Sequence, residues 1–78
     1  MKTTPNYPDI LRLVGLDVDE ATEIIQTQHG AREYDDTIDD GGDAPGTYVM
    51  RRTCTMPHGR YIRLYYLDTQ RIVEDIRL

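Results

Sequence analysis

The sequence predicts a small α+β domain, in which one helix packs on a single β-sheet. The chain has 78 residues, which is enough for one core but leaves no room for a second domain or a cofactor-sized cavity. Residues 17–30 have the spacing of a capped amphipathic helix, and residues 47–78 are rich in strand-forming side chains. We therefore expect residues 1–78 to form a single domain.

The first sixteen residues precede the predicted helix. Residues 1–8 are expected to form an extended arm, because Pro5 and Pro8 lack an amide donor and bias the preceding residue away from helix. The apolar stretch 10–16 is interrupted by Gly15 and is short enough to be a single turn or an edge segment on the core.

The clearest local signal is a helix over residues 18–28. Asp17 and Glu20 have capping-box spacing, which places an oxygen acceptor and a negative charge at the positive end of the helix dipole. Gly30 stands where a left-handed cap is expected, and His29 suits the helix C-terminus. The apolar face comprises Val18, Ala21, Ile24 and Ile25.

An acidic segment follows over residues 31–46. It holds six acids and one base, so it carries -5 of a chain whose net charge is -5. Its Asp, Gly and Pro content is typical of turns and disorder, and we expect an inserted mobile loop. Such a loop is either a solvated segment or a surface for a basic partner. The acidic partner surface would comprise Asp35, Asp36, Asp39, Asp40 and Asp43.

A metal site is not expected in this loop. Placing Gly41 at the sixth position of an EF-hand puts Ile38 at the third position and Thr47 at the twelfth, so carboxylates miss the required ligand positions. His29 and His58 lie far apart and have no paired Cys or His, which argues against zinc.

Three strands are predicted after the acidic segment, over residues 47–55, 60–67 and 72–78. Between the first two, residues 56–59 place Pro second and Gly fourth, which suits a type I turn closing an antiparallel hairpin. Tyr and Arg alternate along both strands, as is typical of a half-exposed sheet and of protein interfaces.

Several function classes are disfavoured. The single cysteine, Cys54, allows no intrachain disulfide and is expected to be a buried strand thiol. No Ser/His/Asp arrangement, phosphate loop or acid/base carboxylate pair is present, so we expect neither an enzyme nor a cofactor. The Lys and Arg residues form no patch that could neutralise phosphates, so nucleic acid is not a favoured partner. Tyr and Arg side chains can nevertheless stack on nucleobases. No apolar run suits a membrane span or signal peptide, and the compartment stays open.

Short motifs at both ends of the chain resemble the potato type I serine protease inhibitors. Those near the N-terminus are Tyr7-Pro8-Asp9, Leu13-Val14-Gly15, Val18, Glu20-Ala21 and Ile25. Those near the C-terminus are Tyr61-Ile62-Arg63-Leu64-Tyr65-Tyr66 and the stretch 71–78. The resemblance implies one helix on a small mixed β-sheet, with the strands on either side of residues 56–59 parallel and the intervening loop splayed open.

The resemblance also implies a site. The inhibitory loop would comprise Cys54, Thr55, Met56, Pro57 and His58. Arg60 and Arg63 would support this loop, and a second register would place Met50 and Arg51 at the contact instead. The partner would then be a subtilisin- or chymotrypsin-like serine protease.

Two functions from different classes are therefore open. One is serine protease inhibition through an exposed, substrate-like loop. The other is a non-enzymatic interaction module or small antagonist that binds a protein through the acidic loop or through the Tyr/Arg-rich sheet. Binding through the acidic loop should weaken sharply with ionic strength, whereas insertion of an uncharged loop into a cleft should not.

Overall fold

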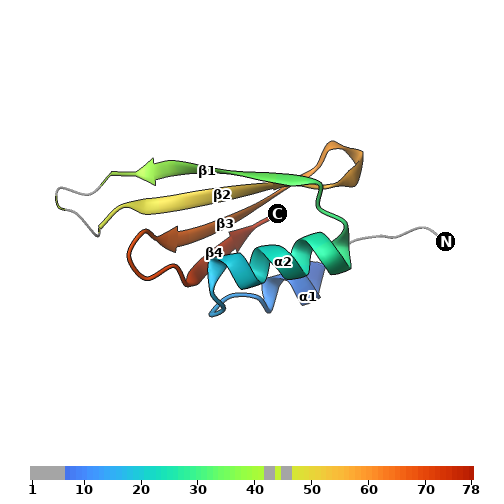
Figure 1. Cartoon of the computed structure of the whole chain (residues 1–78), viewed down its shortest axis with the longest axis horizontal. Coiled ribbons are helices and arrows are strands. Elements are labelled where there is room, and N and C mark those ends of the chain that lie inside the picture. Colours follow the sequence, from blue (N-terminus) through green and yellow to red (C-terminus); the bar gives the residue numbers. More distant parts are fainter. Residues whose placement is uncertain (1–6, 42–43, 45–46) are drawn as a thin grey trace.

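The computed structural model describes residues 7–41, 44 and 47–78 as an α+β domain (Figure 1). Its helices are α1 (Tyr7–Leu11) and α2 (Val18–His29), and a short 3-10 turn, η1, covers Pro57–Gly59. Its strands are β1 (Glu33–Asp40), β2 (Val49–Thr55), β3 (Tyr61–Leu67) and β4 (Val73–Arg77). The predicted α+β class is confirmed, with one helix of 12 residues packed on one sheet.

Helix α2 begins at Val18, as the sequence predicts, and ends at His29, one residue later than predicted. The Asp17 carboxylate accepts hydrogen bonds from the backbone N–H groups of Asp19 and Glu20, at 2.9 and 3.2 Å. Gly30 adopts a left-handed conformation with φ of 80°, and its N–H donates to the Ile25 carbonyl. Both ends therefore satisfy backbone groups that a helix terminus leaves without partners.

The last two residues of the expected extended arm, residues 7 and 8, are helical. Residues 1–6 lie outside the described residues, but Tyr7 and Pro8 open helix α1. Proline is tolerated in a first helical turn, where its missing N–H has no intrahelical partner to lose. The helix buries Ile10 and Leu13 follows in a turn, so the apolar stretch does pack on the core.

The four strands form one sheet in the order β1-β2-β3-β4. Every neighbouring pair is antiparallel, so the expectation of a mixed sheet is wrong. Strands β2 and β3 pair without a register shift, from Thr55 opposite Tyr61 to Val49 opposite Leu67. This is the hairpin that the turn residues 56–59 predict, because a tight connection can join only antiparallel neighbours.

The acidic segment is not a mobile loop over its first half. Residues Glu33–Asp40 form the edge strand β1, which pairs with β2 along its length and has a bulge between Ile38 and Asp40. Arginines of β2 explain this difference, since Arg52 binds Asp36 and Arg51 binds Asp39 across the strand pair. These ion pairs offset charge that would otherwise disfavour a strand.

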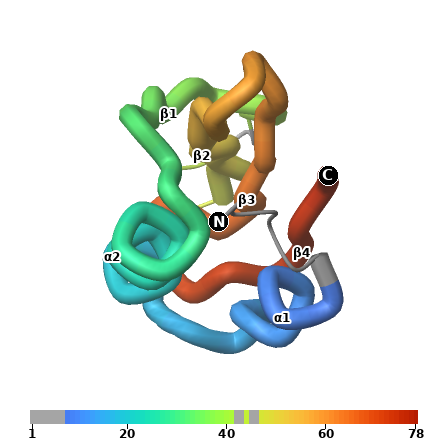
Figure 2. Tube along the Cα trace, turned by 90° about the vertical axis from the view of Figure 1, so that its right-hand side faces the viewer, coloured from blue at the N-terminus to red at the C-terminus, as the bar shows by residue number. Residues whose placement is uncertain are grey.

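The core lies between the sheet and the two helices, which occupy one side of it (Figures 1 and 2). Successive side chains of a strand point to opposite faces, so one alternating set from each inner strand faces the helices. The buried apolar side chains are Ile10, Leu13, Val18, Ala21, Ile25, Cys54, Met56, Ile62, Leu64, Tyr66, Val73 and Ile76. Within the described residues, the opposite face of the sheet is covered by no helix.

Candidate binding surface

The segment expected to be an inhibitory loop is a tight, partly buried turn. Cys54 ends the core-facing side of β2 and is 0% exposed, and Met56 is 2% exposed. The Met56 N–H donates to the Arg60 carbonyl at 2.7 Å and closes the turn. His58 and Gly59 have positive φ angles of 72° and 78°. The reversal is tight, but it is not the predicted type I turn, whose third residue has a negative φ. The expectation of a splayed loop between parallel strands is therefore wrong.

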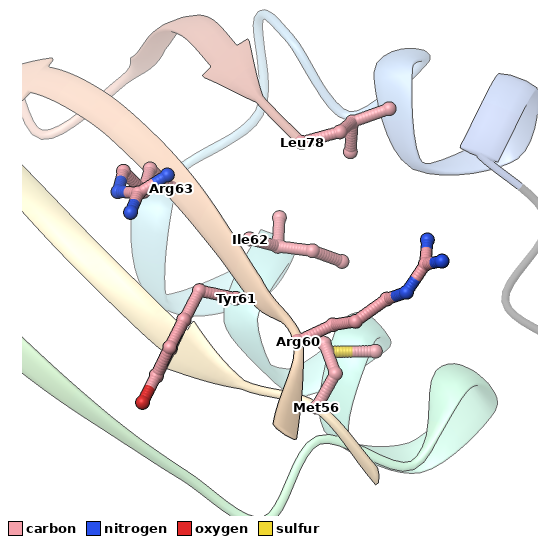
Figure 3. A pocket seen from close by; sticks show the side chains of 6 residues that line it. All are labelled: Met56, Arg60, Tyr61, Ile62, Arg63 and Leu78. Atoms are coloured by element: carbon pink, nitrogen blue, oxygen red, sulfur yellow. The ribbon is translucent and has the colours of Figure 1, made fainter. Parts of the chain in front are cut away.

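The two arginines expected to support that loop lie on different sides of β3. Figure 3 shows Tyr61 and Arg63 extending from one side of the strand, and Arg60 and Ile62 from the other. An open hollow of about 390 Å³ lies at this end of the sheet. Its lining residues are Met56, Arg60, Tyr61, Ile62, Arg63 and Leu78. Met56 contributes to the wall of this hollow, but it is only 2% exposed and its side chain belongs to the core.

The second register is also unsuited to insertion into a protease. Met50 and Arg51 lie inside β2, where each is paired with a residue of β1 on one side and of β3 on the other. The Arg51 guanidinium further donates to Asp39 at 3.2 Å and to the Thr37 hydroxyl at 3.4 Å. A residue held in two strand pairs cannot extend into a cleft as a substrate does.

Only some residues of the predicted acidic surface are free of ion pairs within the described part of the chain. Asp36 and Asp39 contact arginines and keep about a third of their side-chain surface exposed, at 33% and 36%. Asp35 and Asp40 are exposed on β1, and Asp43 lies outside the described residues. Across residues 7–41, 44 and 47–78, no group of three or more His, Cys, Asp or Glu side chains is placed to hold a metal ion.

Arg52 is a buried cation, and its burial was not predicted from the sequence. Its side chain is 3% exposed and donates to Asp36 at 2.8 and 2.9 Å, to Asp19 at 2.8 Å and to the Thr22 hydroxyl at 3.0 Å. The Tyr34 ring covers the guanidinium, with its centroid 4.3 Å away. A signal was present, because Arg52 shares its strand parity with Met50 and Cys54, which face the core.

The protonation equilibria of this cluster follow from its contacts. Burial alone would lower the pKa of Arg52, but hydrogen bonds to Asp36 and Asp19 raise it overall. Hydrogen bonds from Arg52 and then Arg71 lower the pKa of Asp19, whose second oxygen lies 3.0 Å from Arg71. Asp19 and Arg52 therefore stay charged at neutral pH, and the cluster ties α2 to β1, β2 and the turn before β4.

The expected buried thiol is confirmed. Burial raises the pKa of Cys54 from 9.0 to about 11, so the neutral thiol predominates at physiological pH. Since the thiolate is the nucleophilic form, a neutral and inaccessible sulfur is unsuited to covalent catalysis.

The sheet face that no described helix covers is the broadest candidate site. We call it the Tyr/Arg face and define it by the outward-facing side chains of β2 and β3. They are Val49, Arg51, Thr53 and Thr55 on β2, and Tyr61, Arg63, Tyr65 and Leu67 on β3. None of these side chains is buried, and Tyr61 is 51% exposed. Aromatic and aliphatic groups thus lie beside guanidinium groups on an accessible, rigidly paired surface.

Cross-strand pairing arranges charges on the Tyr/Arg face in rows. Asp35, Thr53, Arg63 and Arg77 form one row from β1 to β4, and the neighbouring row places Tyr65 between Arg51 and Asp75. Arg77 binds Asp75 at 3.0 Å and lies over the Tyr65 ring at 5.9 Å. Acidic groups therefore lie at both edges of this face, Asp35 on β1 and Asp75 on β4, and arginines are distributed over β2, β3 and β4.

In the part of the chain that the structure describes, no helix is long and apolar enough to cross a membrane. Comparison of the sequence with protein-family models and curated proteins, and of the fold with solved structures, finds no match.

Proposed function

We propose that the protein is a non-enzymatic interaction module that binds a protein partner through the Tyr/Arg face. The observation that carries this proposal is that Tyr61 is exposed, and Tyr65 and Leu67 half-buried, beside arginines on a sheet face left uncovered by the described helices. A merely solvated face of an antiparallel sheet needs no aromatic or aliphatic side chains. Tyr and Arg are enriched at protein interfaces because they combine contact area with hydrogen bonding.

The geometry favours this surface over an inhibitory loop. A substrate-like loop gains affinity when an exposed, extended backbone is fixed before docking. Here the corresponding backbone turns back on itself, and the Met56 side chain contributes to the core. Exposing Met56 to a protease would require the hairpin end to open.

The geometry also favours this surface over the acidic segment alone. Asp36 and Asp39 already bind arginines within the molecule, so a basic partner would compete with those contacts. The buried Arg52 would lose Asp36, one of its two carboxylate partners, in that exchange, which is costly for a desolvated cation.

The test is binding of a captured partner to matched surface variants. The immobilised protein is used to isolate partners from a cell extract, and the affinity of each purified partner is then measured for Tyr61→Ala and Leu11→Ala. Leu11 is a suitable control because it is 46% exposed but lies on the helix side, at the end of α1. We expect Tyr61→Ala to weaken binding and Leu11→Ala to leave it unchanged. The reverse pattern would place the interface on the helices and refute the proposal.

A further inference from the structure

Arg63 differs from the other arginines of the sheet. Arg51, Arg52 and Arg77 each bind an aspartate within the molecule. Arg63 makes no side-chain hydrogen bond or ion pair with any residue in the described ranges 7–41, 44 and 47–78, although it lies at the centre of β3 and is half-buried. A half-buried guanidinium without an anion keeps its donors available for a ligand.

The surroundings of Arg63 favour an anion at this position. Its cross-strand partners are Thr53 on β2, which is neutral, and Arg77 on β4, whose charge is already paired with Asp75, so neither neighbour supplies an anion to Arg63. Asp35 lies in the same row but two strands away, about 10 Å by the ordinary strand spacing. Tyr61 and Tyr65 flank Arg63 along the same side of β3 and supply aromatic surface on both sides of its guanidinium group.

We infer that Arg63 anchors an Asp or Glu side chain of the protein partner, with neighbouring apolar groups of that partner packed on Tyr61 and Tyr65. This inference rests on the proposed function and specifies its partner chemistry. A guanidinium matches a carboxylate through two parallel hydrogen bonds, and these bonds are about twice as strong as those between neutral groups. The contact would supply the negative charge that Arg63 lacks, whereas the neighbouring Arg77 already binds Asp75.

A single carboxylate fits this face better than a polyanion. Glu33 and Asp35 belong to β1 positions that share the same side of the sheet, opposite Thr55 and Thr53. A nucleic acid crossing the strands would bring its phosphates close to these acids, whereas one acidic side chain over β3 avoids them. The net charge of -5 also disfavours association with a polyanion.

The experiment uses random peptides displayed as a library and selected on the full chain. Affinities of the enriched peptides are then measured for the wild type and for Arg63→Gln, Arg12→Gln and Tyr61→Ala, after each variant is shown to unfold cooperatively. Arg12 provides a matched loss of one charge, because it is exposed and follows α1 in the helix layer. Replacing the acid of each peptide by its amide completes a double-mutant cycle with Arg63→Gln.

We expect the enriched peptides to share an Asp or Glu and to bind Arg63→Gln about tenfold more weakly. Arg12→Gln should change affinity by less than about twofold. The amide peptide should be weaker on the wild type but not on Arg63→Gln. Peptides that need Tyr61 but show no preference for an acid would refute the role of Arg63 and leave the proposed function intact. Peptides that bind Tyr61→Ala and Arg63→Gln as they bind the wild type would refute both.

A parallel titration tests nucleic acid with a fluorescent oligothymidine of about 16 nucleotides at about 0.15 M salt. We expect no saturable binding. Binding that Arg63→Gln abolishes would assign this arginine to nucleic acid and overturn the inference.

Discussion

Arg52 donates hydrogen bonds to both carboxylate oxygens of Asp36, from Nε at 2.8 Å and from Nη2 at 2.9 Å. This bidentate contact joins the edge strand β1 to β2. The Arg52 Nη1 group also reaches Asp19 on α2, so one side chain connects three elements. Strand β1 is exposed along its whole length and gains a buried attachment through this arginine.

Removing the Arg52 guanidinium should therefore destabilise the fold. We expect Arg52→Leu to lower the free energy of unfolding by about 2 kcal/mol, because Asp36 loses its bidentate partner and Asp19 loses one of two cations. The value is below that of a fully buried pair because both aspartates keep contact with water. Urea unfolding at neutral pH measures the change.

Arg51→Leu is the matched control for this prediction. Arg51 is the preceding residue of β2, and its pair with Asp39 is exposed by 36% at both side chains. The cost should stay below about 1 kcal/mol. If Arg51→Leu and Arg52→Leu lowered the free energy of unfolding equally, the buried cation would have no special role.

The Asp19 ion pairs should contribute stability only while the carboxylate is charged. Hydrogen bonds from Arg52 and Arg71 lower its pKa below 3.8 in the folded state, so the folded protein releases this proton more readily than the unfolded chain. The contribution is then present above pH 3.8 and is lost as pH falls through the lower folded value. The stability difference between wild type and Asp19→Asn should shrink over this acid range. A difference that is constant with pH would show that the charge is not responsible.

Alkaline pH should destabilise the protein through Cys54. Burial raises the pKa of this thiol from 9.0 to about 11, so the unfolded chain loses the proton first and stability falls between pH 9 and pH 11. Burial, and then the nearby Asp36 carboxylate, raise the pKa of Tyr66 and act in the same direction. The slope of unfolding free energy against pH should be smaller in Cys54→Ala than in the wild type. A thiol reagent that labels native protein as fast as unfolded protein would contradict the burial.

Serine proteases should not be inhibited through the turn at residues 56–59. Titrating subtilisin, chymotrypsin and elastase with the protein should leave their activity unchanged, because Met56 is 2% exposed. Met56→Lys should destabilise the fold without creating a trypsin inhibitor, since it places a charge in the core. Tight inhibition that shifts to trypsin in this variant would contradict this prediction and support a substrate-like inhibitory loop.

The local signals of the sequence are those that the structure confirms. Asp17 and Gly30 determine the ends of α2 through nearby backbone contacts, and Pro57 and Gly59 determine a hairpin turn that involves only its own residues. Such features depend on few neighbours in the chain. The three later strands were likewise predictable from their composition and alternation.

The features that depended on distant residues were not predictable in the same way. The sequence of β1 predicts a loop because aspartates disfavour strands. Ion pairs with Arg51 and Arg52, which are distant in the sequence, reverse that preference. Met56 is predicted to lie in a loop because Pro57 and His58 follow it, but its side chain is buried in the core. Arg63 was expected to support a loop, but the antiparallel pairing of β2 and β3 places it on the Tyr/Arg face.

The most direct measurement compares photo-crosslinking from two positions of the protein in a native cell extract. A photoreactive phenylalanine analogue replaces Tyr65 in one variant and His58 in another, so that one probe lies on the Tyr/Arg face and the other in the exposed part of the turn. We expect the probe at position 65 to form a discrete adduct with a partner protein and the probe at position 58 to form none. An adduct from position 58 alone would contradict binding through the Tyr/Arg face.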